Sequence, residues 1–381
     1  MDRGKQTMGV SAPDVPPSLA GDRRIVMTLD AGGTSLRFDA IRGADLLAPC
    51  VLPTDPDHLD VCLARIVEGF ERVRASLPEP PAAISFGFPG PADYPRGIVE
   101  ALPNFPAFRG GVALGPMLED RFGLPVFVNN DASLFAFGEA IAGFLPYVNR
   151  LVAEAGGDRC YRHLFGVTLG TGFGGGFVVD GRLLSGDNST AGEAWLLRNI
   201  DDVEQPVEDA ASIRAVRRVY AEQTGLPRAS VPEPRAIHAI GLGRAPGDPQ
   251  AAREAFRRLG RAAGDAMAQA LTLFDGLAVI GGGMAEAQEL FMPALLEALN
   301  DEFHRADGPQ RRLIPHAFAI DDPGQRRLFL HGDVRSISVP GSSRTVTYDA
   351  LPRIAVGISR LGTSRAVAIG AYAFALERLD G

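Results

Sequence analysis

Three short glycine-rich segments constrain the fold of this chain more than any other feature of its sequence. They are "DAGGT" at 30–34, "GTGFGGG" at 170–176 and "IGGGM" at 280–284, and each follows an apolar run typical of a buried strand. A glycine turn lets backbone N–H groups approach an anion, because no Cβ stands in the way. A tight hairpin is the alternative for any single turn, but three such turns together favour an anion-binding role.

The first two glycine turns occupy matching places in two halves of the chain. Residues 25–29 form an apolar run before the first turn, and "SLRFDAIRG" after it alternates like a second strand. Residues 164–186 repeat strand, glycine turn and strand, and end in a hairpin signal at Asp180-Gly181. Each copy is followed by a helix and a further strand. The pattern predicts a duplicated α/β unit with a cleft between two lobes.

Helical spacing and strand alternation predict several further elements. Apolar residues at helical spacing predict a helix over 57–77, with Asp57 as its N-cap. A second amphipathic helix is predicted over 251–274, and another over 285–300. In 304–350 the alternation in "RLFLHGDVRSISV" and "RTVTY" predicts an accessory hairpin around "PGSS".

Composition excludes several classes of protein. The 381 residues suggest two or three domains, and the net charge of −8 disfavours a nucleic-acid partner. The three cysteines lie far apart, which favours a reducing, cytoplasmic compartment over a disulfide framework or a zinc knuckle. No apolar run reaches the roughly 18 residues that a membrane helix needs. The first 22 residues lack an apolar core segment, so we expect a disordered tail and not a signal peptide.

Polar residues at strand ends are the first candidates for a site. Asn129, Asn130 and Asp131 follow the apolar run "LPVFV" and precede a predicted helix. They either cap that helix or meet a ligand, because ligands bind at strand ends in open α/β sheets. Asp30 directly precedes the first glycine turn, where it fits either a Mg²⁺–phosphate site or an Asx-turn. The glycine turns match neither the dinucleotide-binding fingerprint nor the P-loop pattern in the required context.

A set of motifs, in this order, resembles the ROK family (repressors, open reading frames and sugar kinases). The motifs are "LDAGGT", "FGFPGPAD", "LPNFPAF", "VNNDASLFAFGEA", "TLGTGFGGGFVVDGRLLSG", "AGEAW", "VIGGGM" and "GTSRAVAIGAYAFAL". The resemblance covers roughly residues 24–303 and 353–376. It implies a duplicated actin-like (ribonuclease-H-like) two-lobe ATPase fold that phosphorylates a hexose with ATP, usually at C6, in the interlobe cleft. It also implies a homodimer with a small-molecule sugar as partner, and neither nucleic acid nor membrane.

The resemblance also implies a division of the chain into lobes. The expected parts are a tail at 1–22, a small N-terminal lobe at 23–130 plus 366–381, and a large C-terminal lobe at 131–365 with the accessory hairpin near 304–350.

Site residues carry over from the family by position. Asp131 corresponds to the general base, which would take the proton of the attacking hydroxyl. The sugar-binding positions are Asn104, Asn130, Glu193 and, through a shortened segment, Glu208. The ATP-binding positions are Asp30, Gly32, Gly33 and Thr34 in the first turn, Gly170, Thr171, Gly172, Gly174 and Gly175 in the second, and Gly281, Gly282 and Gly283 in the third. The cofactors implied are ATP and Mg²⁺, with Asp30 at the metal.

Other roles stay open for some of these residues. Asn104 and Asn130 could simply close loops, and Glu193 could be a carboxylate in the first turn of a helix. Trp195, the single tryptophan, is expected to be core packing and not a platform for the sugar.

One segment departs from the family pattern. The family commonly follows "AGE" with a Gly-His pair and a cysteine-rich zinc loop, whereas this chain has Leu196 in place of the histidine and no cysteine there. We therefore expect no zinc and an altered contact on the anomeric side of the sugar. A catalytically weak or inactive sugar-binding sensor is the alternative function. Repressors of the family carry a DNA-reading segment before the first glycine turn, and we expect none in the 29 residues before Asp30.

Overall fold

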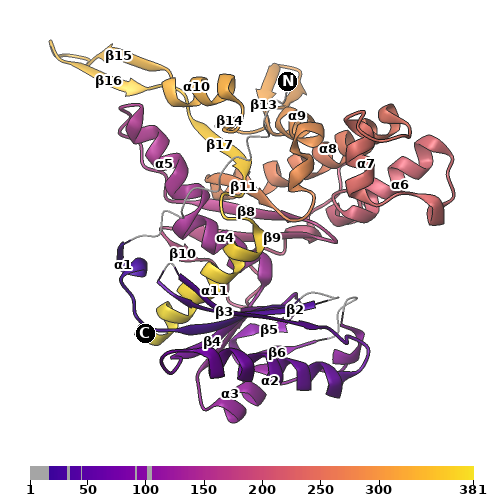
Figure 1. The fold of residues 1–381 in the computed structure, drawn as a ribbon. Coiled ribbons are helices and arrows are strands. Elements are labelled where there is room, and N and C mark those ends of the chain that lie inside the picture. The colour runs from indigo at the N-terminus through magenta and orange to yellow at the C-terminus, as the bar shows by residue number, and fades with distance from the viewer. Residues whose placement is uncertain (1–16, 32–34, 44, 91, 101–104) are drawn as a thin grey trace, which may run out of the picture.

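The computed structural model describes residues 17–31, 35–43, 45–90, 92–100 and 105–381 (Figure 1). They form two β-sheets, one in the lower and one in the upper part of the view, with helices packed against both. Within these ranges no helix has the length and apolar character needed to cross a membrane.

The first sheet has five strands in the order β3-β2-β1-β4-β7. Its strands β1, β2 and β3 form an antiparallel meander, and β4 and β7 extend it in parallel. The β1 residues Val26 to Leu29 are all buried, because helix α2 contacts one part of the sheet and α11 another. The strands are β1 (Val26–Ala31), β2 (Ser35–Arg42), β3 (Asp45–Pro53), β4 (Ala83–Gly87) and β7 (Val126–Asn129).

The second sheet repeats this strand order and adds one strand. Its order is β10-β9-β8-β11-β17-β14, in which β8, β9 and β10 form the meander and β11, β17 and β14 extend it in parallel. The predicted duplication is therefore confirmed. The strands are β8 (Leu164–Leu169), β9 (Phe173–Val179), β10 (Arg182–Leu183), β11 (Leu277–Gly281), β14 (His316–Ala319) and β17 (Arg353–Ile358).

The remaining elements cover these sheets or project from them. The helices are α1 (Pro17–Ala20), α2 (Leu59–Ser76), α3 (Leu114–Phe122), α4 (Asp131–Ala142), α5 (Phe144–Glu154), α6 (Ile213–Thr224), α7 (Pro234–Gly241), α8 (Pro249–Phe274), α9 (Gln288–Leu299), α10 (Pro323–His331) and α11 (Thr363–Asp380). The short strands outside the two sheets are β5 (Ala92–Asp93), β6 (Ile98–Val99), β12 (Glu302–Arg305), β13 (Gly308–Arg311), β15 (Val334–Ser338) and β16 (Thr345–Asp349).

Helices α4 and α11 pack tightly against each other between the two sheets (Figure 1). A Cβ atom at Gly138 would lie 2.0 Å from the carbonyl oxygen of Ala366. A Cβ atom at Gly370 would lie 2.0 Å from the carbonyl oxygen of Leu134. The two backbones approach so closely that no side chain fits at either position, which explains both glycines.

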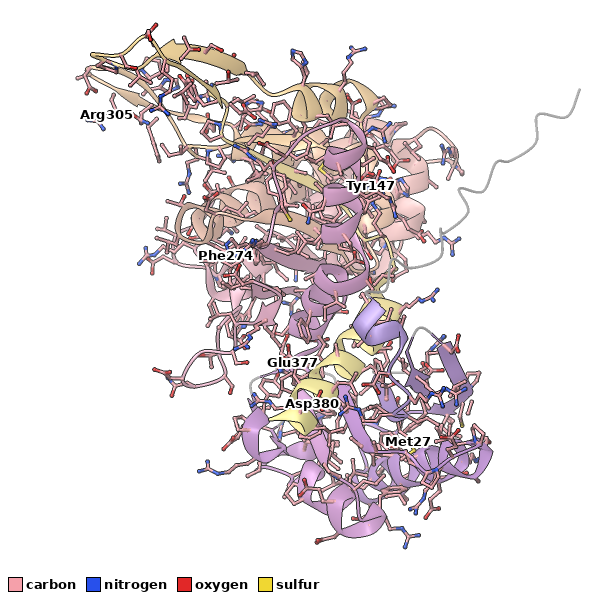
Figure 2. The ribbon with its side chains drawn as sticks, turned by 90° about the vertical axis from the view of Figure 1, so that its left-hand side faces the viewer. Met27, Tyr147, Phe274, Arg305, Glu377 and Asp380 are labelled. Carbon is pink, nitrogen blue, oxygen red and sulfur yellow. The ribbon has the colours of Figure 1, made fainter. Side chains whose placement is uncertain are left out.

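Helix α11 connects the two halves of the molecule. Its buried side chains belong to the apolar core of the second sheet, and that core also takes in Val26, Ile41 and Ala83 of the first sheet. Figure 2 shows the end of α11, marked by Asp380, beside the lobe that contains Met27. The lobe boundaries expected from the family resemblance stay a prediction.

The predicted helix over 251–274 is confirmed as α8. The Asp248 side chain caps it by accepting hydrogen bonds from the backbone N–H groups of Gln250 and Ala251, at 2.9 and 3.0 Å. Helix α9 lies directly on it, because a Cβ atom at Gly260 would be 2.2 Å from the carbonyl oxygen of Phe291.

The predicted accessory hairpin in 304–350 is only partly correct. Strands β15 and β16 do pair around "PGSS". The letters "RLFLH" before them, however, form the end of helix α10 and not a strand. Asp322 caps that helix by accepting from the Gln325 N–H, with Pro323 in the first turn, and this start signal outweighs the strand-like alternation. The same segment also supplies β14 to the second sheet.

The predicted N-cap of α2 is wrong. Helix α2 begins at Leu59, so His58 and not Asp57 holds the N-cap position, without a capping hydrogen bond from its side chain. The His58 ring instead bonds to Asp55 through Nδ1 and Oδ1, 2.8 Å apart.

Candidate active site between the two sheets

Strand β7 ends and helix α4 begins at the polar segment singled out in the sequence. The Asn130 side chain caps α4, accepting hydrogen bonds from the backbone N–H groups of Ala132 (2.9 Å) and Ser133 (3.1 Å). Asn129 is buried, and its Oδ1 accepts from the Asn130 N–H at 2.8 Å. Asp131 is the first residue of the helix, where partial positive charge favours a carboxylate. Asn130 therefore caps the helix and, by doing so, also fixes the position of Asp131.

The environment of Asp131 makes its carboxylate a stronger base than an ordinary aspartate. The side chain reaches solvent, yet protein on either side displaces much of the surrounding water, and this desolvation raises its pKa. The Ala132 N–H opposes the shift, whereas the carboxylates of Asp30 and Glu193 add to it. A carboxylate that is open to a ligand and has a raised pKa is suited to accept a proton.

Three polar side chains from different segments converge around Gly90. A Cβ atom there would lie 2.7 Å from the Tyr94 hydroxyl, 3.4 Å from Glu193 Oε1 and 3.5 Å from Asn130 Nδ2. Asn130 Nδ2 donates to the Tyr94 oxygen at 3.2 Å, and the Tyr94 hydroxyl donates to the carbonyl of Phe88 at 3.0 Å. A phenol, an amide and a carboxylate thus surround one point, an arrangement that can bind several hydroxyl groups of a ligand. The sequence analysis did not identify Tyr94 as a site residue.

Trp195 fixes the orientation of Glu193. Its indole Nε1 donates to Glu193 Oε2, which leaves Oε1 near Gly90. Glu193 precedes a short 3-10 helix but makes no capping hydrogen bond with it, so the capping role left open for this residue is not what the carboxylate does. Trp195 is only partly buried, and its contact with Glu193 adds a positioning role to the expected packing role. Leu196, at the position of the family histidine, is 58% exposed.

The second glycine turn joins β8 to β9, and there is open space beside its first glycine. No atom lies within 4 Å of the position that a Cβ atom at Gly170 would take. Thr171 is exposed at the turn, and the Gly170 carbonyl accepts from the Ile213 N–H at 2.9 Å. A backbone that is held in place beside open space fits the approach of a phosphate.

Glu208 lies at this glycine turn. Its Oε2 accepts from the backbone N–H of Phe173 at 3.2 Å and would touch a Cβ atom at Gly172 at 2.4 Å. Its Oε1 pairs with Arg214 at 2.9 Å. The described contacts bring Asn130 and Glu193 together, but they place Glu208 against the turn and not in that cluster.

Two other glycines of this motif have a packing role. Gly174 and Gly175 lie within strand β9 and not in the turn. A Cβ atom at Gly174 would lie 2.6 Å from Ala132 Cβ at the start of α4, and one at Gly175 would lie 2.8 Å from Ala194 Cβ. These glycines let α4 and the segment of Glu193 lie close to the sheet, whatever part they take in nucleotide binding.

The third glycine turn meets the second one. Gly282 has a φ of +88°, and a Cβ atom there would lie 2.1 Å from the carbonyl oxygen of Leu169, the last residue of β8. Its N–H donates to Thr363 Oγ1, at the start of α11, over 2.8 Å. Gly281 is packed as well, whereas Gly283 has open space. The two turns and the start of α11 therefore form one surface, with open backbone at Gly170 and Gly283.

The first glycine turn is described only in part. Asp30 is half-buried at the carboxyl end of β1, opposite Arg37 of β2. Gly32, Gly33 and Thr34 lie outside the described residues, and so does Asn104.

Local hydrogen bonds close the segment that replaces the family zinc loop. The Val207 N–H donates to the Leu197 carbonyl at 2.7 Å, and the Asn199 N–H donates to the Gln205 carbonyl at 3.2 Å. Val207 and Asn199 are both buried. Nowhere in the described part of the chain do three or more His, Cys, Asp or Glu side chains gather as metal ligands. The absence of zinc stays a prediction.

Known proteins resemble all or part of this chain. A family model described as "ROK family" matches residues 26–317. The crystal structure of a glucokinase from Parabacteroides distasonis is 51% identical, covers 94% of this chain and 99% of its own, and has a TM-score of 0.83. A glucokinase from Streptomyces coelicolor is 29% identical over 295 residues, 70% of this chain and 84% of its own. An N-acetyl-D-glucosamine kinase from Vibrio parahaemolyticus is 33% identical over 165 residues, 43% of this chain and 49% of its own.

Proposed function

The chain belongs to the ROK family, with its duplicated actin-like ATPase fold, and we propose that it works as an ATP-dependent sugar kinase. It would transfer the γ-phosphoryl group of ATP to a hydroxyl group of a hexose, at C6, with Asp131 as the general base. Glucose and N-acetylglucosamine are the first sugars to test, because the similar proteins include glucokinases and an N-acetyl-D-glucosamine kinase.

One observation carries this proposal: an accessible carboxylate lies beside a cluster of hydrogen-bonding side chains. Asp131 directly follows Asn130. The Asn130 amide, the Tyr94 hydroxyl and the Glu193 carboxylate all lie close to Gly90. A sugar held there by its hydroxyl groups would bring one of them to the carboxylate. Phosphoryl transfer asks little covalent chemistry of the protein, so positioning and charge stabilisation supply most of the rate.

The side chains divide the chemistry between binding and proton transfer. We infer that the Asn130 amide and the Glu193 carboxylate hold sugar hydroxyls, while Asp131 takes the proton of the attacking hydroxyl as its oxygen bonds to phosphorus. The raised pKa of Asp131 strengthens it as the acceptor of that proton. Asn104, outside the described residues, remains a proposed sugar ligand.

The glycine turns are proposed to hold ATP. The open backbone at Gly170 and Gly283 offers N–H groups where a side chain would otherwise stand. Mg²⁺ bound with ATP neutralises phosphate charge, and Asp30 is the carboxylate that would hold it. Glu208 was predicted to bind sugar, but its contacts with Phe173 and Arg214 support a role in fixing the second turn.

The Asp131→Asn variant tests the base directly. Turnover should fall at least ~10²-fold with little change in sugar affinity, because the amide keeps the shape but cannot accept the proton. Asp120→Asn is the matched control, since Asp120 is an exposed carboxylate on α3 that loses the same charge far from the site. ADP release should be measured with ATP, Mg²⁺ and a panel of hexoses, N-acetylamino sugars and sugar acids. Near-normal turnover in Asp131→Asn would refute the assignment of the base.

A sugar sensor without phosphoryl transfer is the second candidate. It is favoured by one observation, the exposed Leu196 at the position of the family histidine. Thermal stabilisation by one sugar of the panel, without ADP release from any of them, would support the sensor. Sugar-dependent ADP release would exclude it. The predicted homodimer is a separate question, which sedimentation would answer.

A further inference from the structure

A large cavity lies at the amino ends of the strands of the second sheet, at the opposite end from the glycine turns. Its volume is about 740 Å³. It is lined by His163, Gly276, Pro315 and Pro352, which stand at the amino ends of β8, β11, β14 and β17. The second and third glycine turns leave β8 and β11 at their carboxyl ends, so this cavity is separate from the candidate active site.

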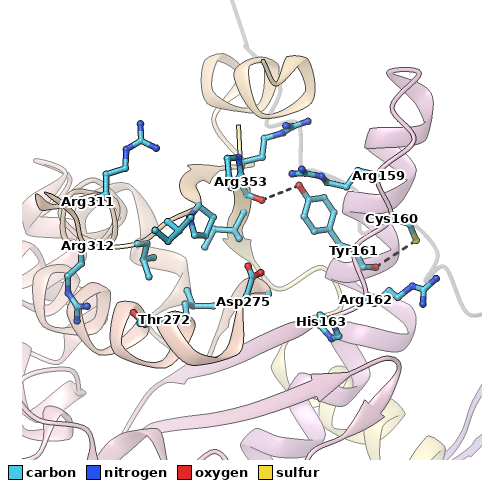
Figure 3. Close-up of a pocket in the computed structure, with 17 residues that line it drawn as sticks. Arg159, Cys160, Tyr161, Arg162, His163, Thr272, Asp275, Arg311, Arg312 and Arg353 are labelled. Carbon is cyan, nitrogen blue, oxygen red and sulfur yellow. Dashed lines mark hydrogen bonds between the residues drawn. The ribbon is translucent and has the colours of Figure 1, made fainter. Parts of the chain in front are cut away.

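Arginine side chains dominate the charge of this cavity (Figure 3). The arginines that line it are Arg159, Arg162, Arg311, Arg312 and Arg353, against one lining carboxylate, Asp275. Arg353 is paired with Asp349, and Arg312 and Arg162 have carboxylates at 3.6 and 3.8 Å. Within the described residues, no carboxylate lies within ion-pair distance of Arg159 or Arg311. Asp349 and Asp158 lie near enough to raise the pKa of Arg159, and Glu302 is the cross-strand neighbour of Arg311. The arginines that line the cavity still outnumber its one lining carboxylate.

Two residues of the cavity lining each carry a buried nitrogen atom without a hydrogen-bond partner. One is Nε of Arg353, whose side chain is only 7% exposed, and the other is Nδ1 of His163. Burying an unpaired donor costs free energy, so such atoms are rare in native structures. Arg353 uses Nη1 to bind Asp349 and the carbonyl of Leu351, which leaves its Nε unpaired.

An aromatic pair holds two of the arginines near each other. Tyr161 stacks on Phe329 with ring centroids 5.7 Å apart. The Arg159 guanidinium lies 5.9 Å from the Tyr161 ring, and the Arg353 guanidinium lies 5.6 Å from the Phe329 ring. Figure 3 shows Arg159 and Arg353 on the side of Tyr161 that carries its hydroxyl group, which donates to the Arg353 carbonyl at 3.2 Å. Stacked guanidinium groups are held ready to bind, so they lose little freedom when an anion arrives.

We propose that this cavity is a second ligand site, which binds a small metabolite through its phosphoryl group. Guanidinium groups match the geometry of phosphate oxygens. Arg159 and Arg311 lie on opposite sides of the cavity (Figure 3), and either of them would meet the phosphoryl group. The cavity volume falls within the usual range for small-molecule sites, and apolar side chains such as Leu313 and Ile354 offer contact for an organic body. The site is independent of the proposed kinase activity.

Calorimetric titration of the full-length protein tests the site without relying on turnover. The probes are inorganic phosphate and glucose 6-phosphate, and the test variant is Arg159→Gln/Arg311→Gln. The control is Arg72→Gln/Arg121→Gln, which removes the same charge from exposed arginines on α2 and α3. Saturating sugar and a non-hydrolysable ATP analogue are included in parallel titrations to fill the candidate active site.

The wild type and the control should bind glucose 6-phosphate with equal affinity, and the test variant at least about 10-fold more weakly, because a charged contact to the phosphoryl group is lost whichever arginine makes it. Binding of inorganic phosphate with the same dependence on the variant also supports the site, and shows that the phosphoryl group alone is recognised. Absence of heat in the wild type would refute the proposal. So would equal affinity in both variants, or binding that vanishes when sugar and nucleotide analogue are present.

Discussion

Replacing Gly282 by alanine should destabilise the protein strongly, whereas the same change at Gly283 should not. The two glycines are neighbours in the third turn and look alike in the sequence. At Gly282 the backbone has a φ of +88°, and a Cβ atom would lie 2.1 Å from the carbonyl oxygen of Leu169. At Gly283 nothing lies within 4 Å and φ is outside the positive region.

The expected loss follows from two costs at Gly282. A non-glycine residue at positive φ costs about 1–2 kcal/mol. Pushing the turn away from the Leu169 backbone adds about 1–3 kcal/mol, the usual cost of overpacking. The free energy of unfolding should therefore fall by about 2–5 kcal/mol. For Gly283→Ala the change should lie within about 1 kcal/mol and can be stabilising, because alanine restricts the unfolded chain.

Equilibrium unfolding in guanidinium chloride, followed by circular dichroism, measures both variants against the wild type. The ATP KM of Gly283→Ala is measured alongside, and it should rise because the new methyl group fills the space that we assign to the nucleotide. A stable Gly282→Ala protein would refute the packing argument. An unchanged ATP KM in Gly283→Ala would count against nucleotide binding at the third turn.

Two further variants test the electrostatics and the sugar cluster. Asp39 is 7% exposed, and burial raises its pKa to about 6, so its contribution to stability is complete below about pH 4 and is lost as the pH rises to about 6. Relative to Asp39→Asn, the wild type should therefore lose about 3 kcal/mol across that window in denaturant titrations, and parallel pH profiles for the two proteins would contradict this. Trp195→Phe should raise the sugar KM about 10-fold with a smaller change in kcat, because the Glu193 carboxylate loses the indole N–H that orients it. Steady-state kinetics measure both constants, and an unchanged KM would show that Trp195 has no role in sugar binding.

Much of the architecture follows from short-range patterns in the sequence. The hairpin at Asp180-Gly181 was predictable because both residues need positive φ, and they have values of 49° and 77°. Helix α8 was predictable from its apolar stripe and length. Strand β14 was missed because its four residues carry no alternation or turn signal strong enough to be seen alone.

The site was harder to predict because its residues meet only in the folded chain. Tyr94 lies 36 positions before Asn130, and no sequence pattern connects the two. Trp195 is a neighbour of Glu193, yet its hydrogen bond depends on the turn between them. The sequence does not distinguish a glycine that allows close packing from one that leaves open space. Only the position of the surrounding backbone in the folded chain does so.

The close contact between β9 and the start of α4 has a mechanical consequence. Gly174 lets Ala132 rest directly on the second sheet, while a Cβ atom at Gly87 of β4 would lie 3.0 Å from Asp131 Cα, so the base is in close contact with both sheets. Tyr94 and Gly90 belong to the segment after β4, on the other sheet. A shift of one sheet against the other would therefore change the position of the base relative to the glycine turns, to Tyr94, or to both. Mutations at this junction should therefore change sugar binding and the rate of reaction together.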